Sequence, residues 1–533
     1  MPASGHLRRF VWLLFAVVPL LCGALAVALG QDGNWDLRNY HWYNAYAILN
    51  GRLDLDMAPA QTATYYNPAI DVPFYLLANA LPAMAASFIL AAVQGCNFIL
   101  LYLIAARLLL LKNEKAQVFA AAVLALVGIA GGGHLPLLGT VFYDNILSLF
   151  VFAGVLIVLQ SAAILQEGPL APALLRAALA GVCVGCAVGL KLPSQVFAVG
   201  VCFGLLFIPG PFWRRFMLSF VCGLGIIAGF LALGGWWVAE LWHHFASPLF
   251  PYFNDVIRSP WALPASYRDA RFTPKSLMLA ITLPFRIFLD GTVAGEVGFR
   301  DGRILMAYIA LAVTPVMMLI GRGASAPKLM AADRFAARYL VAVFALSYLA
   351  WLLLFDIYRY AIPLEMLAPC AVVACVSFWP VSGQRHVVLA SAMLGFMVLT
   401  TVPGNWGRLP WAGKMVNVQV PDIARPKDSM IITSGVAPTS FVIPSFPREI
   451  PFLRLQSYMV EPQHDTQFNA VARARIAGHT GDIYALQAVY EEQNAARVLA
   501  AYALELGECH PLPTNLDQEL EFCAVRRRTA DQP

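Results

Sequence analysis

Charged residues are scarce in this sequence. Only 13% of its 533 residues are charged and 59% are hydrophobic, whereas soluble globular proteins carry about 25% charged residues. This shortage excludes an ordinary soluble protein over most of the chain. The net charge of +5 arises from basic residues scattered among short loops and not from one basic patch, so we expect no nucleic-acid partner.

Cysteine is nearly absent from the polar parts of the sequence, where Cys509 and Cys523 are the only ones. The others lie in apolar stretches, in which a thiol is most simply a small packing residue. Cys183 and Cys186 form a CxxC in mid-span, but no histidine or acid lies nearby. We therefore expect them to serve neither a metal nor a redox reaction.

Long apolar runs dominate what is present. About eleven of them are long enough to cross the ~30 Å hydrocarbon core of a bilayer. The first exceeds the 7–15 apolar residues of a signal peptide, so we expect it to be retained. The sequence thus predicts a polytopic α-helical membrane protein with spans near 10–29, 83–111, 116–133, 141–162, 172–190, 194–210, 216–239, 303–321, 338–356, 360–380 and 387–403.

The basic residues predict the orientation of these spans. Short loops rich in Lys and Arg face the cytoplasm. With a cytoplasmic N-terminus, that side receives few acids and these basic residues: Arg8, Arg9, Arg107, Lys112, Lys115, Arg176, Arg214, Arg215, Arg322, Lys328, Arg334, Arg338 and Arg385. We expect a protein of the bacterial inner membrane, with its outer loops and C-terminus on the periplasmic side.

The same pattern predicts two domains. Residues 1–403 form the transmembrane domain, with outer loops 31–82 and 240–302, and we expect the stretch 274–289 to form helices in the outer interface. From residue 404 charges return, and about 130 residues suffice for a small extracytoplasmic α/β domain. Strand-like runs at 430–432, 441–443 and 520–525 and a helical stretch at 482–506 support it. On an oxidising side we expect Cys509 and Cys523 to form a disulfide.

The first outer loop is polar, aromatic and rich in acids. Asp36 is placed to cap a helix over 37–50 that ends at Gly51. Asp36, Tyr40 and Tyr43 are spaced to share one face of that helix. Capping alone would explain Asp36, but it does not explain the clustered polar side chains that we take as substrate-binding candidates: Arg38, Tyr40, His41 and Tyr66. Three further acids of the loop are interpreted as solvated: Asp54, Asp56 and Asp71.

Polar residues also appear at the predicted outer ends of the spans. Asp144 opens an apolar span, where an acid is a functional candidate, although it could merely cap the helix. Lys191 and Arg359 occupy tight turns on the side that is poor in basic residues, so we interpret them as ligands of a lipid phosphate. Further substrate-binding candidates on this side are His134, Tyr252 and Asn254.

Together these motifs resemble the GT-C superfamily of integral-membrane glycosyltransferases. The similar features are Asp36 before a tyrosine-rich helix, Asp144 opening the fourth span, the Gly-Leu-Lys-Leu-Pro turn at Lys191, the Pro-Leu-Phe-Pro-Tyr-Phe-Asn run at 248–254, and Tyr-Arg-Tyr around Arg359. Many members carry two adjacent acids in the first loop, whereas here Leu37 follows Asp36. That departure leaves open which residue is the base and whether a divalent metal (Mg or Mn) takes part.

The resemblance implies a hexosyl- or pentosyltransferase. It would move a sugar from a polyprenyl-phosphate carrier to a hydroxyl of a glycan, lipid or protein acceptor at the outer face, with inversion. Asp36 would act as general base, Asp144 would orient the acceptor or hold a metal, and Lys191 and Arg359 would stabilise the leaving phosphate. The alternatives are a transporter or flippase of a lipid-linked or polar solute, and a glycan polymerase or ligase. A transporter would place its ionisable groups near mid-membrane.

Overall fold

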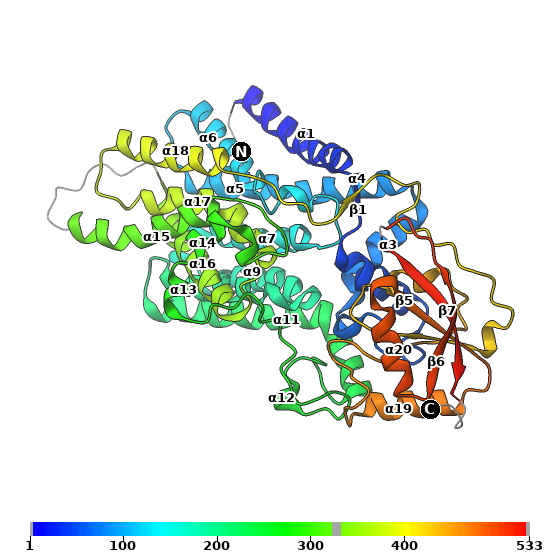
Figure 1. The fold of residues 1–533 in the computed structure, drawn as a ribbon. Helices are drawn as coiled ribbons and strands as arrows, with labels where there is room; N and C mark the ends of the chain where they lie inside the picture. The colour runs from blue at the N-terminus through cyan, green and yellow to red at the C-terminus, as the bar shows by residue number, and fades with distance from the viewer. Residues whose placement is uncertain (1–3, 322–331, 517, 529–533) are drawn as a thin grey trace. The chain divides into compact units, whose positions relative to one another are not determined.

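The computed structural model describes residues 4–321, 332–516 and 518–528, so that Arg322 and Lys328 lie outside the described part. The chain divides into two compact units (Figure 1). The helical unit comprises residues 1–29, 88–235 and 269–406. The mixed unit comprises residues 30–87, 236–268 and 407–533.

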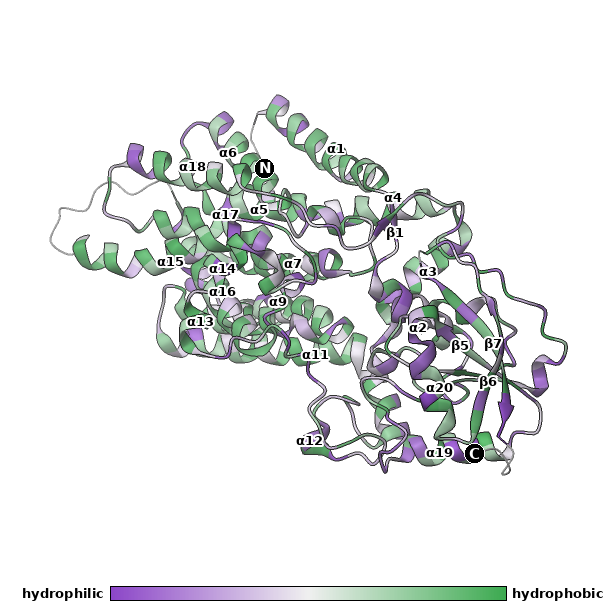
Figure 2. Cartoon of the chain, viewed as in Figure 1, coloured by the Kyte–Doolittle hydropathy of each residue, from purple (hydrophilic) through white to green (hydrophobic). Residues whose placement is uncertain are grey.

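The helical unit consists of apolar helices (Figure 2). Each predicted span contains a helix: α1 (Gly5–Leu29), α4 (Ala83–Gly95) with α5 (Asn97–Leu108), α6 (Glu114–Ile129), α7 (Asp144–Gln160), α9 (Leu170–Leu190), α10 (Gln195–Gly204), α11 (Phe212–Phe245), α15 (Arg303–Ile320), α16 (Arg334–Leu354), α17 (Ile362–Val376) and α18 (Gly383–Leu399). Within the described ranges, seven helices are long and apolar enough to cross a membrane. The chain is thus a polytopic helical membrane protein, and the number of about eleven crossings stays a prediction.

Glycines allow α9 and α11 to pack backbone against backbone. A Cβ atom on Gly181 would lie 2.1 Å from the carbonyl oxygen of Cys222, and one on Gly185 would lie 2.1 Å from that of Ile226. Small residues at four-residue spacing let membrane helices approach in this way. The close contact fixes the end of α9, which is followed directly by Lys191.

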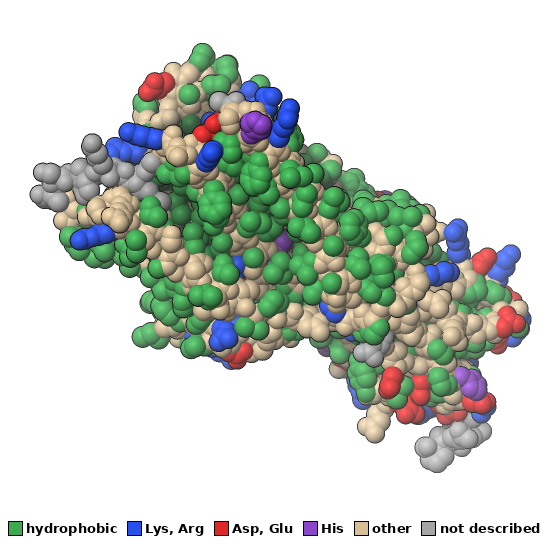
Figure 3. Space-filling view, turned by 90° about the horizontal axis from the view of Figure 1, so that it is seen from above, with side chains coloured by type: hydrophobic (Ala, Val, Ile, Leu, Met, Phe, Trp, Pro, Cys, Tyr) green, Lys and Arg blue, Asp and Glu red, His purple; other side chains and the backbone are tan. Residues whose placement is uncertain are grey.

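The outer surface of α11 is apolar. Its exposed side chains include Phe216, Phe220, Leu224, Ile227 and Leu231. Hydrophobic side chains likewise cover much of the face shown in Figure 3. Soluble monomers rarely expose apolar surface on this scale, so these side chains fit contact with lipid.

The mixed unit contains a five-stranded sheet in the order β4-β3-β5-β7-β6. Its strands are β3 (Ser429–Thr433), β4 (Phe452–Arg454), β5 (Asp482–Ala488), β6 (Leu504–Pro511) and β7 (Leu520–Arg527). β3 is parallel to β4 and β5, whereas β7 is antiparallel to β5 and β6. The helices α19 (Gln467–Gly478) and α20 (Glu492–Ala500) accompany it. The predicted small C-terminal sheet domain is therefore present.

Two local predictions in this region were wrong. The stretch 482–506, predicted as one helix, begins with β5 and ends in β6, and only α20 between them is an α-helix. Pairing of β5 with strands on both sides outweighs its helix propensity. The run 441–443 lies in a 3₁₀ helix, Ser440–Ser445, and not in a strand.

The segment 30–87, which contains most of the predicted first outer loop, shares its core with this sheet. Met57 donates its N–H to the carbonyl of Phe452 at 2.8 Å and accepts the N–H of Arg454 at 3.0 Å. Tyr65 and Trp237 belong to the same buried cluster as residues of β3, β4 and β5. One boundary between the two units falls between residues 406 and 407. However, 30–87 and 236–268 group with the C-terminal residues and not with the helices, because their apolar side chains complete this core.

Other connecting segments are short helices. α11 continues to Phe245, beyond the predicted end of that span at 239. It is followed by α12 (Asn254–Ile257), α13 (Leu277–Ile281) and α14 (Leu283–Leu289). The stretch 274–289 is thus mostly helical, and its interfacial position stays a prediction.

The predicted disulfide is present in the sheet. Cys509 and Cys523 face each other across β6 and β7 and form a disulfide.

Candidate functional site

The helix that carries Asp36 begins earlier than predicted. Asn34 is the capping residue, since its side-chain oxygen accepts the N–H of Leu37 at 2.8 Å. Asp36 has helical backbone angles and makes no side-chain cap hydrogen bond. The prediction that Asp36 caps the helix was therefore wrong, and capping no longer accounts for this acid.

A π-helical turn, Leu37–His41, precedes α2 (Trp42–Leu49). The hydroxyl of Tyr40 donates to Asp36 at 3.2 Å, whereas that of Tyr43 donates to Asp56 at 2.8 Å. The predicted common face of Asp36, Tyr40 and Tyr43 thus holds for its first pair only. The wider turn rotates the residues after it, and such turns often occur at functional sites.

Aromatic side chains extend outward from Asp36. The ring of Tyr40 lies 5.2 Å from that of Tyr66, edge to face. Tyr66 and Tyr252 stack at 5.9 Å, and the hydroxyl of Tyr252 donates to that of Tyr66 at 2.6 Å. Three predicted substrate-binding tyrosines therefore lie together with the carboxylate. Flat rings and hydroxyl groups of this kind suit a polar ligand that also has apolar faces.

A buried histidine–aspartate pair lies beside this group. Nδ1 of His41 is 2.6 Å from Oδ1 of Asp71, and both side chains are nearly inaccessible, at 3% and 2% exposure. The His41 ring also lies 4.0 Å from that of Tyr40. The sequence interpretation of Asp71 as a solvated acid was wrong, because α3 (Asp71–Ala80) buries its first residue against the π-helical turn.

The other acids of the loop differ in burial. Asp56 is buried, and Arg52 donates to both of its oxygens at 2.6 and 2.7 Å. Its interpretation as a solvated charge was therefore wrong, and the pair anchors the loop since Arg52 also donates to the carbonyl of Ile450. Asp54 is exposed, as expected, with Nε2 of His244 at 2.9 Å.

Two other predicted ligands form hydrogen bonds within the mixed unit. Arg38 donates to the side chain of Gln518 at 2.9 Å. Asn254 is fully buried and donates to the carbonyls of Ser259, Ala262 and Leu263. The second arrangement occupies the Asn254 amide within its own loop, so we do not propose it as a substrate contact.

In the helical unit, Asp144 and Lys191 meet. Lys191 Nζ donates to both Asp144 oxygens at 3.0 and 3.1 Å and to the carbonyl of Phe142 at 2.9 Å. The side chain of Lys191 is 14% exposed and that of Asp144 is 6% exposed. Tyr143 precedes α7 in a left-handed conformation, and Asp144 occupies the first turn, where the helix dipole also favours a negative charge.

Arg359 forms a second ion pair close by. It donates to Glu296 at 2.6 Å, and its guanidinium carbon lies 4.1 Å from the centre of the Phe142 ring. Burial alone would raise the pKa of Glu296, but the charge and hydrogen bonds of Arg359 and a hydrogen bond from Trp406 outweigh it and lower the pKa to about 2. Glu296 could not be predicted from the sequence, because it lies in a loop 63 residues from its partner.

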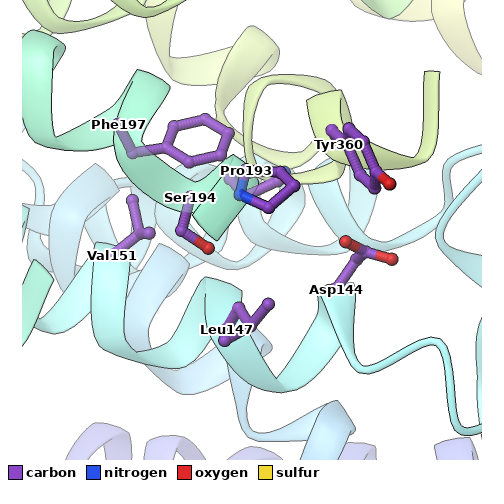
Figure 4. Close-up of a pocket in the computed structure, with 8 residues that line it drawn as sticks. Asp144, Leu147, Val151, Pro193, Ser194, Phe197 and Tyr360 are labelled. Carbon is purple, nitrogen blue, oxygen red and sulfur yellow. The ribbon is translucent and has the colours of Figure 1, made fainter. Parts of the chain in front are cut away.

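The two cations flank the same residues. Lys191 Nζ lies 5.1 Å and the Arg359 guanidinium carbon 5.9 Å from the Tyr360 ring centre. A pocket beside them is lined by Asp144, Leu147, Val151, Pro193, Ser194, Phe197, Tyr360 and Pro363 (Figure 4). Its wall is apolar apart from the carboxylate and two hydroxyl groups.

His134 is fully buried. Burial lowers the pKa of its imidazole to about 4, so the ring is neutral at pH 7. Its backbone is what connects it to neighbouring elements: its N–H donates to Glu365 and its carbonyl accepts from Asn145. A side chain buried in this way fits a structural role better than the predicted contact with substrate.

The described residues do not present a fitting metal site. Their one group of three potential ligands within 4.8 Å is Cys509, Glu521 and Cys523. The two sulfur atoms of that group are joined in a disulfide and are not thiolates, which zinc and similar metals require. Neither Asp36 nor Asp144 belongs to such a group, so no step is assigned to Mg or Mn.

Comparison with known proteins gives only distant similarity. No protein-family model matches the chain, and no curated protein matches it. The apo oligosaccharyltransferase of Archaeoglobus fulgidus is similar over 92% of this chain and 71% of its own, at 12% identity and a TM-score of 0.46. ArnT from Cupriavidus metallidurans, bound to undecaprenyl phosphate, is similar over 96% and 97%, at 13% identity and a TM-score of 0.41.

Proposed function

We propose that this protein is a membrane glycosyltransferase that uses a polyprenyl-phosphate-linked sugar. The observation that carries the proposal is that Lys191 and Arg359 flank the same two aromatic residues, Phe142 and Tyr360. Cations at membrane depth are costly and usually functional. A phosphate group is an anion that two neighbouring cations of this kind can bind.

The proposed reaction is a displacement at the anomeric carbon. An acceptor hydroxyl attacks that carbon and gives its proton to a carboxylate, for which Asp36 is the candidate base. The bond from the anomeric carbon to the phosphate oxygen breaks with inversion, and its electron pair leaves with the polyprenyl phosphate. Lys191 and Arg359 stabilise the charge that develops on this leaving group, and Asp144 holds Lys191 in place.

The tyrosines around Asp36 support its assignment as the base. Tyr40 donates to one oxygen of the carboxylate, which fixes its rotamer, and Tyr66 and Tyr252 provide flat surfaces for a sugar ring. We propose that catalysis takes place at the outer face of the membrane. Whether the sugar is a hexose or a pentose depends on the pocket shape in the loaded enzyme.

Transfer activity in proteoliposomes tests the proposal. The purified protein would be supplied with polyprenyl-phosphate sugars and candidate acceptors, and release of polyprenyl phosphate would be measured. Asp36→Asn should lower the rate about 10²–10⁴-fold, whereas Asp54→Asn, an exposed acid of the same loop, should leave it unchanged. Full activity of Asp36→Asn would refute the assignment. Uptake of a free solute without donor consumption would favour the transporter.

A further inference from the structure

A buried carboxylate joins α17 to a glycine-rich loop. Glu365 is fully buried in an otherwise apolar helix. Its two oxygens accept the backbone N–H groups of Gly133 at 3.0 Å and His134 at 2.8 Å, and the hydroxyl of Tyr358 at 2.6 Å. An ionisable group within a membrane segment is a functional candidate by default. We call residues 131–134 the glycine loop.

The glycines allow the loop to lie directly on this carboxylate. A Cβ atom on Gly131 would lie 1.8 Å from Oε1 of Glu365, and one on Gly133 would lie 2.8 Å from Oε2. Any other residue at either position would push the loop away. The contact therefore depends on glycine at both sites, which explains why the loop has this composition.

A second buried acid completes the support. Asp301 accepts the N–H of Gly132 at 2.7 Å and is paired with Arg303. Arg303 is fully buried and donates to the carbonyls of Val127 and Ala130 at the end of α6, both at 2.8 Å. The arginine thereby satisfies carbonyls that a helix end leaves without partners.

The glycine loop is also tied to the start of α7. Asn145 donates to the carbonyl of His134 at 3.2 Å, and its own carbonyl accepts from Asn97 at 2.7 Å. Helices α5, α6 and α7 thus all hold the loop that binds Glu365. The loop offers Glu365 a fixed frame and not a mobile partner.

Tyr358 contacts Glu365 and directly precedes Arg359 in the chain, and three contacts hold it in place. Its N–H donates to the carbonyl of Ala294 at 2.7 Å, two residues before Glu296, and its ring lies 4.4 Å from that of Phe299. The hydroxyl bond to Glu365 is its third restraint. Because Tyr358 is restrained at backbone, ring and hydroxyl, the direction of the next residue, Arg359, is restrained as well.

We propose that Glu365 is a positioning residue that, through Tyr358, holds Arg359 in the orientation that binds a lipid phosphate. The inference rests on the proposed function, since it presumes that Arg359 contacts the phosphate. Three donors converge on Glu365, and a carboxylate can accept all three. A glutamine would turn one acceptor into a donor facing an N–H or O–H group. The acceptor oxygens of Glu365 are thus needed for geometry and not for contact with substrate.

The experiment compares two tyrosine variants of the intact protein in detergent. Tyr358→Phe removes the hydroxyl bond to Glu365. Tyr339→Phe is the matched control, because Tyr339 is equally buried in the same unit and its hydroxyl donates to the carbonyl of Val201 at 3.2 Å. The probe is a short-chain polyprenyl phosphate, with Kd from calorimetric titration, the donor KM from transfer assays and Tm from thermal unfolding.

We expect Tyr358→Phe to raise Kd and KM by about 3- to 10-fold, as the loss of one hydrogen bond allows, while its Tm falls no further than that of Tyr339→Phe. Glu365→Gln should raise Kd at least as much. If Tyr358→Phe binds like the control, or if both lose binding in proportion to Tm, the inference is overturned. Arg359→Ala separates the positioning role from the proposed function. If Arg359→Ala leaves Kd unchanged, the proposed function is contradicted. If Arg359→Ala abolishes binding and Tyr358→Phe binds normally, only the positioning role of Glu365 is overturned.

Discussion

The mixed unit contains two histidine–aspartate pairs that differ in burial, and this difference predicts different effects on stability. His41 and Asp71 are 2.6 Å apart with side chains 3% and 2% exposed. His244 and Asp54 are 2.9 Å apart with side chains 20% and 84% exposed. The distances are similar, so burial is the main variable.

Asp71→Ala removes the partner of a buried imidazole nitrogen. Hydrogen bonds to charged groups contribute about 1.5–3 kcal/mol, whereas exposed ion pairs contribute about 0–1 kcal/mol. For a unit of 150–250 residues, each kcal/mol shifts Tm by about 2–4 °C. Asp71→Ala should therefore lower Tm by about 3–12 °C, and Asp54→Ala by about 0–4 °C.

Scanning calorimetry of the detergent-solubilised protein measures both shifts under one condition. Asp71→Asn provides an intermediate case, because its amide oxygen can still accept a hydrogen bond from His41 but carries no charge. The expected order of Tm is wild type and Asp54→Ala highest, then Asp71→Asn, then Asp71→Ala. Equal losses for Asp54→Ala and Asp71→Ala would refute the reasoning from burial.

Three other perturbations have defined outcomes. Gly185→Ala should lower Tm, since its Cβ would lie 2.1 Å from a backbone carbonyl and overpacking costs about 1–3 kcal/mol; Gly395→Ala, with nothing within 4 Å, should not. Cys523→Ser should cost about 3 kcal/mol in urea unfolding, because the disulfide closes a short loop of sequence separation 14. Stability should fall on acidification in two windows. Burial lowers the pKa of His134 to about 4, whereas an unfolded histidine has a pKa of about 6.5. The stability that comes from the neutral imidazole is therefore complete above about pH 6.5 and is lost as the pH falls towards 4. Arg359 outweighs the effect of burial and lowers the pKa of Glu296 to about 2. The stability that comes from the ionised Glu296 is therefore complete above about pH 4.3 and is lost as the pH falls towards 2. Measurements of Tm as a function of pH check both windows.

The positions of the helices could be predicted because hydrophobic length is a property of contiguous residues. Every predicted apolar run contains a helix in the structure. The sheet was harder, because a strand such as β5 is stabilised by neighbours that are distant in sequence. Its own residues, Asp482–Ala488, contain several helix-favouring types, and local propensity is a weak guide when pairing is non-local.

In the candidate site, too, single unusual residues could be predicted from the sequence, whereas contacts between distant residues could not. Lys191, Arg359 and Asp144 could be found because a charge stands out in an apolar segment. The partner of Arg359, Glu296, could not be predicted, because it lies in a loop where an acid is ordinary. The pairing of Asp71 with His41 could not be predicted either, because it depends on the packing of α3 against the π-helical turn. The wider turn itself has no sequence signature, although it decides which side chains accompany Asp36.

Glu365 differs from these residues, because its position in the sequence marks it as unusual. It is an acid within the predicted span 360–380, and such residues are functional candidates by default. A residue that acts through others is recognised only when its hydrogen-bond partners are known.

The pairing of both cations with acids bears on how a lipid phosphate would bind. A lone cation at this depth is unfavourable, so Lys191 and Arg359 require partners before the ligand arrives. Asp144 is 6% exposed and lies at a helix N-terminus, whereas the side chain of Glu296 is 26% exposed. Water can therefore solvate Glu296 more readily if the phosphate takes its place. We therefore expect Arg359 to exchange Glu296 for the phosphate, while Lys191 keeps Asp144 as its partner. The guanidinium of Arg359 must then stay oriented while its counter-ion changes, which is the effect we propose for Tyr358 and Glu365.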